Sequence, residues 1–384
     1  MRPEGRTVLV SGMIAAVPGL GGATWAVLQY LLGLQRLGMQ VFFVESVSPA
    51  ALQPRSAPLC ASENARYFQS VMRTFGLEDS SALLLDGTDE SVGLALENAR
   101  DIARRADVLL NLSGLLVREE LVAQIPVRVY VDLDPAFTQL WYSVQGLDMR
   151  FGLHTHFVTV AESLGQPDCT VPTCGIDWTT TRPPVVLAQW PALRTPGAGF
   201  TTIANWRGYG SIEHQGVLYG QKVHSLRPLL ALPQRTGERF VLALSIHPDE
   251  KADLRALDRY GWELVDPARV AGSPMSYRSF VQASRAEFGL AKSGYVLSRC
   301  GWFSDRSACY LASGRPVIAQ DTGFSSFIEC GQGLLPFRTK EDVAAAVGAV
   351  QGDYARHAAA ARRIAEEYFD SDCVLDRLMT RVLS

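Results

Sequence analysis

Several features that would direct a protein to a membrane, to the outside of the cell or to nucleic acid are missing from this sequence. No apolar run approaches the roughly 20 residues that a membrane-spanning helix needs. The N-terminus leads directly into the strand-like residues 7–10, without an apolar signal segment. The 36 Lys and Arg residues nearly balance the 39 Asp and Glu residues, and the basic residues form no stripe. We therefore expect a cytoplasmic protein with no membrane span and no nucleic-acid partner.

Cysteine and histidine, the common ligands of transition metals, are also scarce. There are seven cysteines and six histidines, and the odd cysteine number predicts reduced thiols. Cys169 and Cys174 have a spacing loosely compatible with half of a zinc site, but no second pair or nearby histidine accompanies them. His154 and His156 could share a metal only on an extended chain, and no third ligand is evident. We expect no metal site.

Hydrophobic residues, at 47% of the 384, suffice for two domains with large cores. In the first half, apolar runs without strict alternation are separated by amphipathic segments, a pattern that predicts a parallel sheet covered by helices on both faces. The expected strands are 7–12, 40–44, 82–85, 108–112, 127–131 and 157–160. The expected helices are 23–37, 63–75 and 92–105.

A second alternating series follows residues 179–199, whose four prolines and few charges indicate an interdomain connection. Its expected strands are 200–204, 240–246 and 262–265, and its expected helices are part of 217–230, then 251–260, 276–284, 341–350, 354–369 and 374–383. We therefore predict an α/β fold with two Rossmann-like domains facing across a cleft. The predicted divisions are 1–183, 184–366 and a C-terminal helix, 367–384, that packs back on the first domain.

Residues 295–319 form the most informative unit of the second series. Residues 295–297 are expected to be a strand, Gly301 a break, the segment up to Gly314 a helix, and 316–319 the next strand. Ser304 or Asp305 would then cap the helix N-terminus, where unpaired N–H groups and the helix dipole attract an anion. Phosphate is the usual anion at such a site, although many capped helices bind nothing.

Motifs in and around this unit resemble those of the GT-B glycosyltransferases. The run Arg299-Cys-Gly-Trp-Phe-Ser304 resembles the His-Cys-Gly-Trp-Asn-Ser core of the donor-binding box of plant natural-product glycosyltransferases. The run Leu311-Ala-Ser-Gly-Arg-Pro-Val317 is similar to the Ala-x-Gly-x-Pro-Val run of many GT-B enzymes, and the Gly19-Leu-Gly-Gly22 loop precedes a helix as in that family. The chain also resembles a bacterial set of small GT-B proteins that share its 287–292 and 302–306 runs.

The resemblance implies a metal-independent glycosyltransferase without a cofactor, which moves a sugar from a nucleoside-diphosphate donor to a small-molecule or saccharide acceptor. Such a transfer needs a stabilised leaving diphosphate, a held sugar and, for inversion, a base that takes the proton of the attacking hydroxyl. Basic side chains and a helix start would replace a metal ion at the diphosphate. The expected diphosphate and nucleotide ligands are Arg207, Lys222, Asp266, Lys292, Arg299, Ser304, Asp305, Arg306 and Ser307.

Two departures from the plant box concern the donor. Arg299 stands where the box has a His near the diphosphate, and a guanidinium can bind two phosphate oxygens at once. The carboxylate that usually holds the donor ribose would fall near Cys309, and Asp305, one turn earlier, could take its place. Arg207 and Lys222 could equally be solvated surface charges.

The sugar is expected at the turn after the strand 316–319. In the resembling families such a turn presents amides and a polar side chain to the sugar hydroxyls, a role that Asp321 and Thr322 fit, while Gly323 permits close backbone approach. Glu287 is assigned to the sugar as well. A simple ion pair between Glu287 and Lys292 is the alternative.

The first domain is expected to supply the acceptor side and the catalytic groups. Gly21 and Gly22 would face the cleft beside the acceptor. Asp132, which follows an expected strand, is the first choice for the base if the enzyme inverts. His154 could touch the sugar or act as the base in its place. The nearby aromatic residues 137, 141 and 142 form either an apolar acceptor wall or the buried face of a helix.

Two other function classes fit the same plan. A nucleotide-sugar 2-epimerase would need carboxylates and histidines that converge on the sugar ring, and no acceptor pocket. A two-lobed binding protein would normally carry a secretion signal, which this sequence lacks. The donor base, the acceptor, the stereochemical course and the oligomeric state stay open at this level.

Overall fold

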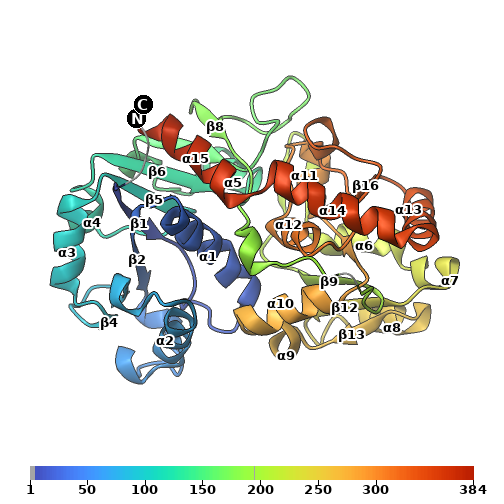
Figure 1. The fold of residues 1–384 in the computed structure, drawn as a ribbon, viewed down its shortest axis with the longest axis horizontal. Coiled ribbons are helices and arrows are strands. Elements are labelled where there is room, and N and C mark those ends of the chain that lie inside the picture. The colour runs from blue at the N-terminus through green and yellow to red at the C-terminus, as the bar shows by residue number, and fades with distance from the viewer. Residues whose placement is uncertain (1–4, 194) are drawn as a thin grey trace.

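Two large sheets organise the part of the chain that the computed structural model describes, residues 5–193 and 195–384 (Figure 1). The first sheet has the strand order β4-β3-β2-β1-β5-β6-β7-β8, and all its pairs are parallel except β3 with β4. Its strands are β1 (Thr7–Ser11), β2 (Gln40–Val47), β3 (Ser81–Leu85), β4 (Ser91–Gly93), β5 (Val108–Leu112), β6 (Val127–Asp132), β7 (His156–Thr159) and β8 (Trp178–Thr180). This sheet and its helices are called the first lobe below.

The second sheet has the parallel order β13-β12-β9-β14-β15-β16 and forms the second lobe. Its strands are β9 (Phe200–Asn205), β12 (Phe240–Ser245), β13 (Glu263–Val265), β14 (Ala286–Gly289), β15 (Val317–Gln320) and β16 (Leu334–Phe337). A small antiparallel hairpin, β10 (Ile212–His214) and β11 (Val217–Tyr219), extends from this lobe.

Helices cover both faces of each sheet (Figure 1). Those of the first lobe are α1 (Gly21–Arg36), α2 (Glu63–Phe75), α3 (Leu96–Arg105), α4 (Glu119–Val122) and α5 (Phe137–Ser143). Those after it are α6 (Lys222–Leu226), α7 (Leu232–Thr236), α8 (Lys251–Tyr260), α9 (Pro267–Ala271), α10 (Pro274–Ala283), α11 (Ser293–Ser298), α12 (Asp305–Ala312), α13 (Lys340–Gly352), α14 (Tyr354–Tyr368) and α15 (Ser371–Val382). Short 3₁₀ turns lie at Pro49–Ala51, Leu59–Ala61, Glu78–Ser80, Phe151–Leu153, Leu187–Gln189, Arg227–Leu229 and Phe324–Ser326.

The two-sided burial of β1 shows why its sequence is apolar at every position. Successive side chains of a strand point to opposite faces of the sheet. Val8 and Val10 accordingly pack into the core that holds α1 and α2, whereas Leu9 packs into the core that holds α3 and α4. A strand covered on both faces needs hydrophobic residues throughout, which is the pattern that predicted the parallel sheet.

The lobes share one core around Trp25 of α1. Its ring packs against Trp190 with the ring centroids 4.9 Å apart, and its indole Nε1 donates a hydrogen bond to the Pro274 carbonyl of the second lobe at 2.7 Å. The last helix also returns to the first lobe, because α15 packs on α1 and the Arg36 guanidinium bonds the Asp372 carboxylate at 2.7 Å. Figure 1 shows α15 lying over α1.

Several sequence predictions of single elements are confirmed and some are wrong. The helix expected at 63–75 is α2, which begins after the Ser62 cap and ends at Gly76, where φ is 66°. The strand expected at 295–297 is instead part of the helix α11. The sheet position beside β15 belongs to β14, and its Glu287 and glycine concealed the strand from a hydrophobic pattern. The segment 92–105 begins as the strand β4 and becomes the helix α3 only at Leu96.

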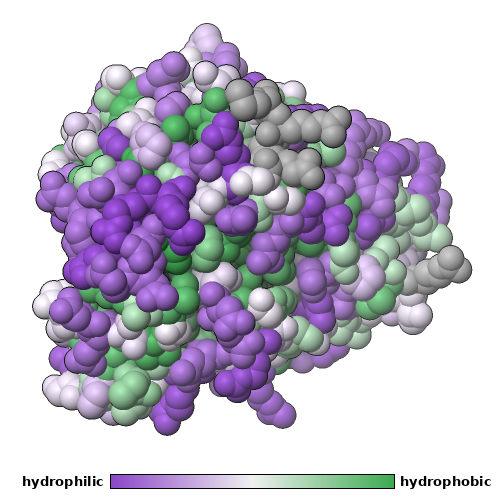
Figure 2. Space-filling model, turned by 60° about the vertical axis from the view of Figure 1, so that its left-hand side comes forward, coloured by the Kyte–Doolittle hydropathy of each residue, from purple (hydrophilic) through white to green (hydrophobic). Residues whose placement is uncertain are grey.

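The surface of the first-lobe side is mostly hydrophilic, and its hydrophobic residues gather in recesses between polar regions (Figure 2). Among the helices that the structure describes, none is long and apolar enough to cross a membrane.

Candidate functional site

A cavity of about 800 Å³ lies between the lobes, at the carboxyl ends of β9, β12 and β13. Ligands of α/β proteins bind at this end of parallel strands, and the volume is within the range of known ligand sites. The lining comprises the first-lobe loop 18–23, the strand ends 203–205 and 244–246, residues 264–268, Lys222 and Ala271. The predicted residues Gly21, Gly22, Lys222 and Asp266 therefore lie together in one cavity.

Lys222 is the distinctive charge of this cavity. It is the first residue of α6, where a reciprocal capping interaction between Gln221 and His224 fixes the helix start. Within residues 5–193 and 195–384 the Lys222 ammonium has no hydrogen bond and no ion pair, and burial together with the nearby Arg306 lowers its pKa well below the usual value. An anion in the cavity would remove this penalty.

The loop before α1 approaches the second lobe closely. A Cβ on Gly21 would lie 2.3 Å from the Ser273 carbonyl oxygen, and one on Gly22 would lie 2.9 Å from the Tyr277 ring. Packing against the second lobe therefore requires glycine at both positions, and both residues also border the cavity. Asp266, which lines the cavity from the second lobe, caps α9 by accepting a hydrogen bond from the Ala268 amide at 2.9 Å.

Glu45, which the sequence analysis did not single out, holds the beginning of this loop. It is 2% exposed, and its carboxylate accepts hydrogen bonds from the amides of Ile14, Ala15 and Ala16 at 2.7 to 3.0 Å. Burial raises the pKa of Glu45 to about 7, against the opposing effect of these amides. Its position at the end of an apolar strand was the available signal, since a carboxylate buried there needs several donors.

The start of α12 borders two smaller cavities. One lies between β14 and α12 and is lined by 289–291, 302–304, 306–307, 319–320 and 324. Ser304 and Ser307 face it, and the Gln320 Oε1 atom is buried there without a hydrogen-bond partner among the described residues. The first amides of a helix have no partner within the helix, but this cavity, at about 10 Å³, has room only for a group the size of a water molecule.

Glu287 and Arg306 form a buried ion pair behind that helix start. The Arg306 Nε atom donates to the Glu287 carboxylate at 2.5 Å, and an Arg306 terminal nitrogen donates to the Ile203 carbonyl at 2.9 Å. Glu287 has no exposed surface and Arg306 has 7%. Glu287 is predicted to contact the sugar and Arg306 the diphosphate, but both side chains point inward, where they hold α12 against β14 and β9.

Lys292 is also engaged, in a contact between the lobes. Its ammonium lies 2.9 Å from the Asp134 carboxylate of the first lobe and 4.0 Å from the centre of the Tyr209 ring. The hydroxyls of Tyr209 and Tyr295 join the same cluster, and both donate to Asp134. Lys292, predicted as a diphosphate ligand, thus neutralises Asp134 instead of pointing into the large cavity.

Neither predicted catalytic residue belongs to the linings of the cavities between the lobes or beside α12. Asp132 is fully buried, and both of its oxygens accept hydrogen bonds, from Thr138, Gln139, Thr159 and the Asp134 amide. Burial raises its pKa to about 6. His154 lies inside the first lobe between the Asn111 side chain and the Arg150 carbonyl, and burial lowers its pKa to about 4. Hydrogen bonds within the first lobe account for the buried positions of both side chains.

The remaining predicted residues lie outside the described cavity linings. Arg207 is exposed and pairs with Glu250 at 2.5 Å. Arg299 is exposed at the end of α11 with a φ of 51°. Asp321 is buried and held by Arg338 at 2.8 Å, and the predicted sugar residues Thr322 and Gly323 form the turn beside it, with the Thr322 hydroxyl donating to the Trp302 carbonyl. This turn is fixed by its own hydrogen bonds.

Potential metal ligands are dispersed. In the described ranges, no group of three or more His, Cys, Asp and Glu side chains is placed to hold a metal ion. Cys169 and Cys174 are half-buried free thiols. His156 hydrogen-bonds its neighbour Thr155 at 2.9 Å.

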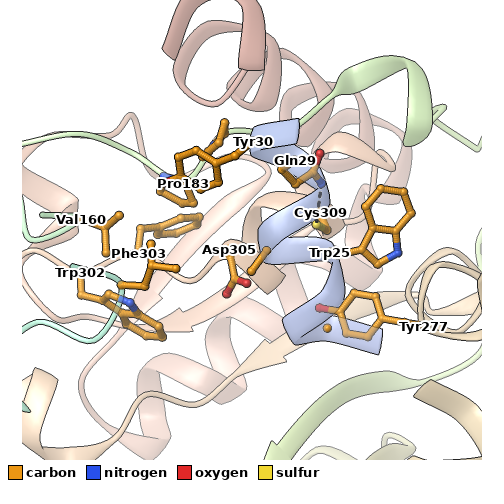
Figure 3. A pocket seen from close by; sticks show the side chains of 14 residues that line it. Trp25, Gln29, Tyr30, Val160, Pro183, Tyr277, Trp302, Phe303, Asp305 and Cys309 are labelled. Carbon is orange, nitrogen blue, oxygen red and sulfur yellow. Dashed lines mark hydrogen bonds between the residues drawn. The ribbon is translucent and has the colours of Figure 1, made fainter. Parts of the chain in front are cut away.

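The second smaller cavity, of about 100 Å³, lies deeper between the lobes and is mainly apolar (Figure 3). Trp302 and Phe303 line one side and Trp25 and Tyr30 of α1 line another. Asp305, the first residue of α12, is its charged group.

Comparison with solved structures places this architecture among the glycosyltransferases of the GT-B fold. An alpha-glucosyltransferase in complex with UDP and a 13-mer DNA containing an HMU base is similar over 99% of this chain and 100% of that chain, with a TM-score of 0.60 and 10% identity. HepE (Alr3699) of Anabaena, in complex with UDP-glucose, matches over 98% and 99%, with a TM-score of 0.59 and 12% identity. A glycosyltransferase from Rickettsia africae matches over 98% of both chains, with a TM-score of 0.53 and 13% identity.

The sequence itself matches no protein-family model and no curated protein. The structural likeness establishes the fold, two Rossmann-like domains facing across a cleft, as the sequence predicted.

Proposed function

We propose that the protein is a glycosyltransferase that moves a sugar from a nucleoside-diphosphate donor to an acceptor hydroxyl, with the nucleotide in the 800 Å³ cavity. The observation that carries the proposal is the unpaired ammonium of Lys222 in that cavity, at the carboxyl ends of the second-lobe strands. Solved structures of the same fold hold UDP or UDP-glucose, which makes uridine diphosphate the first nucleotide to test.

In the proposed reaction the bond between the anomeric carbon and the diphosphate oxygen breaks, and the diphosphate leaves with the bonding electrons. The acceptor oxygen forms the new bond to that carbon and its proton passes to a base. The protein's principal task is to stabilise the negative charge on the leaving group. We assign that task to Lys222, which lines the cavity, and this assignment requires no metal ion.

The base and ribose of the nucleotide belong, in this proposal, beside Asp266 and the end of β13. Val265 and Asp266 both border the cavity, and Asp266 ends the strand with its carboxylate at the start of α9. Gly21 and Gly22 close the opposite wall, so the loop before α1 would cover the diphosphate from the first lobe.

A small molecule or a saccharide is the proposed acceptor. Several of the similar alpha-glucosyltransferase structures contain DNA, which is a ligand of that protein. The present chain has a net charge of −3 and no basic stripe, whereas duplex DNA is bound chiefly through phosphate contacts from clustered Lys and Arg. No observation favours the epimerase alternative, because Asp132 and His154 do not converge on the cavity.

The decisive measurement is calorimetric titration of the protein with UDP, ADP and GDP. We expect UDP to bind and Lys222→Met to weaken that binding at least about tenfold, since a charge-assisted contact to phosphate is lost. Lys340→Met is the matched control, because Lys340 is likewise the first residue of a helix but is exposed and distant from the cavity lining. Equal affinities of Lys222→Met and Lys340→Met would remove Lys222 from the site.

Transfer itself is tested with UDP-glucose and a panel of alcohols, by following release of UDP. Release that depends on the added alcohol supports transfer. Binding of none of the three nucleotides would overturn the proposal as a whole.

A further inference from the structure

The 100 Å³ cavity between the lobes combines an apolar wall with polar groups that lack partners. Trp25, Trp302 and Phe303 supply aromatic surface, and Val160 and the two prolines at 183 and 184 complete the wall. In Figure 3 the Asp305 side chain projects into the space between the Trp302–Phe303 side and α1, and the hydroxyl end of Tyr277 points toward the same space. Apolar pockets with a few converging polar groups are the usual form of a small-molecule site.

Asp305 and the hydroxyls of Tyr30 and Tyr277 are polar groups of this cavity, whereas Gln29 and Cys309, which also line it, bond each other. In the part of the chain that the structure describes, none of the first three groups has a hydrogen bond or an ion pair, and the Tyr30 oxygen is fully buried. Burial first, and the Asp305 charge second, raises the pKa of Tyr30, so this hydroxyl stays protonated and can donate. A buried polar atom without a partner is costly, and a ligand that bonds these atoms would remove the cost.

The size and chemistry of the cavity define what fits. An apolar cavity of about 150 Å³ is known to accept benzene, and this cavity, at about 100 Å³, is smaller, so a single small ring is the largest group that it would take. Asp305 needs a hydrogen-bond donor and Tyr30 needs an acceptor. A hydroxyl group satisfies both at once, whereas a protonated amine has no lone pair to accept from Tyr30.

We propose that this cavity is the acceptor subsite and that it takes an apolar ring bearing a hydroxyl, such as a phenol, with that hydroxyl bonded to Asp305 and Tyr30. The proposal rests on the proposed glycosyl transfer and specifies its acceptor class. The position of the cavity supports the proposal, because Asp305 and Ser304 are adjacent at the start of α12 and face different cavities. Gly22 borders both this cavity and the 800 Å³ cavity, so the two sites are neighbours.

The test is titration of the protein, saturated with UDP, with 4-methylphenol, toluene and benzylamine, followed by ligand-observed NMR. We expect 4-methylphenol to bind at least about tenfold more tightly than the other two, because only its hydroxyl can both donate and accept. Asp305→Asn keeps the shape of the side chain but removes its charge, and we expect it to weaken 4-methylphenol binding about fivefold or more.

A second variant tests the space independently of the hydrogen bonds. Ala26 lines this cavity but not the nucleotide cavity, and Ala26→Leu would fill it with a good helix former. We expect Ala26→Leu to abolish 4-methylphenol binding while UDP affinity stays at the parent value. Ala345→Leu, on the exposed side of α13, is the matched control and should bind both ligands as the parent does.

The outcomes separate the two proposals. Parent protein that binds UDP but binds 4-methylphenol no better than toluene overturns the acceptor subsite and leaves the nucleotide site standing. Unchanged 4-methylphenol binding by both Asp305→Asn and Ala26→Leu also overturns the subsite. Failure of the parent to bind any nucleotide, measured without the phenol, counts against the proposed function instead.

Discussion

Removing one partner of the buried Glu287–Arg306 pair should destabilise the protein far more than removing both. Arg306→Met would leave the Glu287 carboxylate with no exposed surface and no ion-pair partner, and its Oε2 atom already lacks a hydrogen-bond partner among the described residues. Breaking a buried pair in this way costs about 3–5 kcal/mol. At roughly 2.1 cal/mol/K of unfolding entropy per residue over 384 residues, the expected fall in Tm is about 4–6 °C.

The measurement is thermal unfolding followed by tryptophan fluorescence, because both lobes share the core around Trp25 and Trp190 and should lose it together. The double variant Glu287→Leu/Arg306→Met replaces both charges with apolar groups and should recover most of the loss. Arg207→Met is the control: its pair with Glu250 is partly exposed and should contribute less than about 1 kcal/mol. If Arg306→Met lowers Tm no more than Arg207→Met, the buried pair does not hold the start of α12 as argued.

Two further predictions concern the cleft loop and the response to acid. Gly21→Ala should lower Tm and weaken UDP binding, because its Cβ would lie 2.3 Å from the Ser273 carbonyl oxygen, while Gly152→Ala, with open space around it, should change neither in calorimetry. His154 is buried with its pKa lowered to about 4, so its neutral form stabilises the fold and that stability is lost as pH falls from about 6.5 to about 4. Relative to His154→Gln, the parent should lose up to about 3 kcal/mol over that interval in urea titrations; parallel pH profiles would contradict this.

The parts of the fold that the sequence predicted well are those whose pattern has a local cause. The helix α2 was predictable because Ser62 caps its start and Gly76 ends it in the left-handed region. The strand β5 was predictable because its five residues are all buried. The strand β14 was missed because its Glu287 is neutralised by Arg306, 19 residues later in the chain, and no local pattern reports such a partner.

The candidate site likewise contains residues that the sequence could predict and residues that it could not. The glycine loop ahead of a helix predicted Gly21 and Gly22, the end of a strand predicted Asp266, and the family resemblance predicted a basic residue such as Lys222; the cavity lining includes all four. The burial of Asp132 could not be predicted, because no local pattern shows that four hydrogen-bond donors surround its carboxylate within the first lobe. The assignment of functional roles to these residues stays a prediction for the binding experiments.

The start of α12 explains why two cavities of different chemistry meet at one point. A helix N-terminus offers amides to an anion on one side, and here Ser304 and Ser307 border that side. The next residue, Asp305, turns toward the apolar cavity, where its charge faces aromatic rings and two tyrosine hydroxyls. Arg306 then anchors the same turn to Glu287 in β14 and to the carbonyl of Ile203, a residue that lines the 800 Å³ cavity. The nucleotide cavity and the apolar cavity are therefore both coupled to one buried ion pair. Variants of that pair should therefore weaken nucleotide and phenol binding together, whereas Ala26→Leu should separate them.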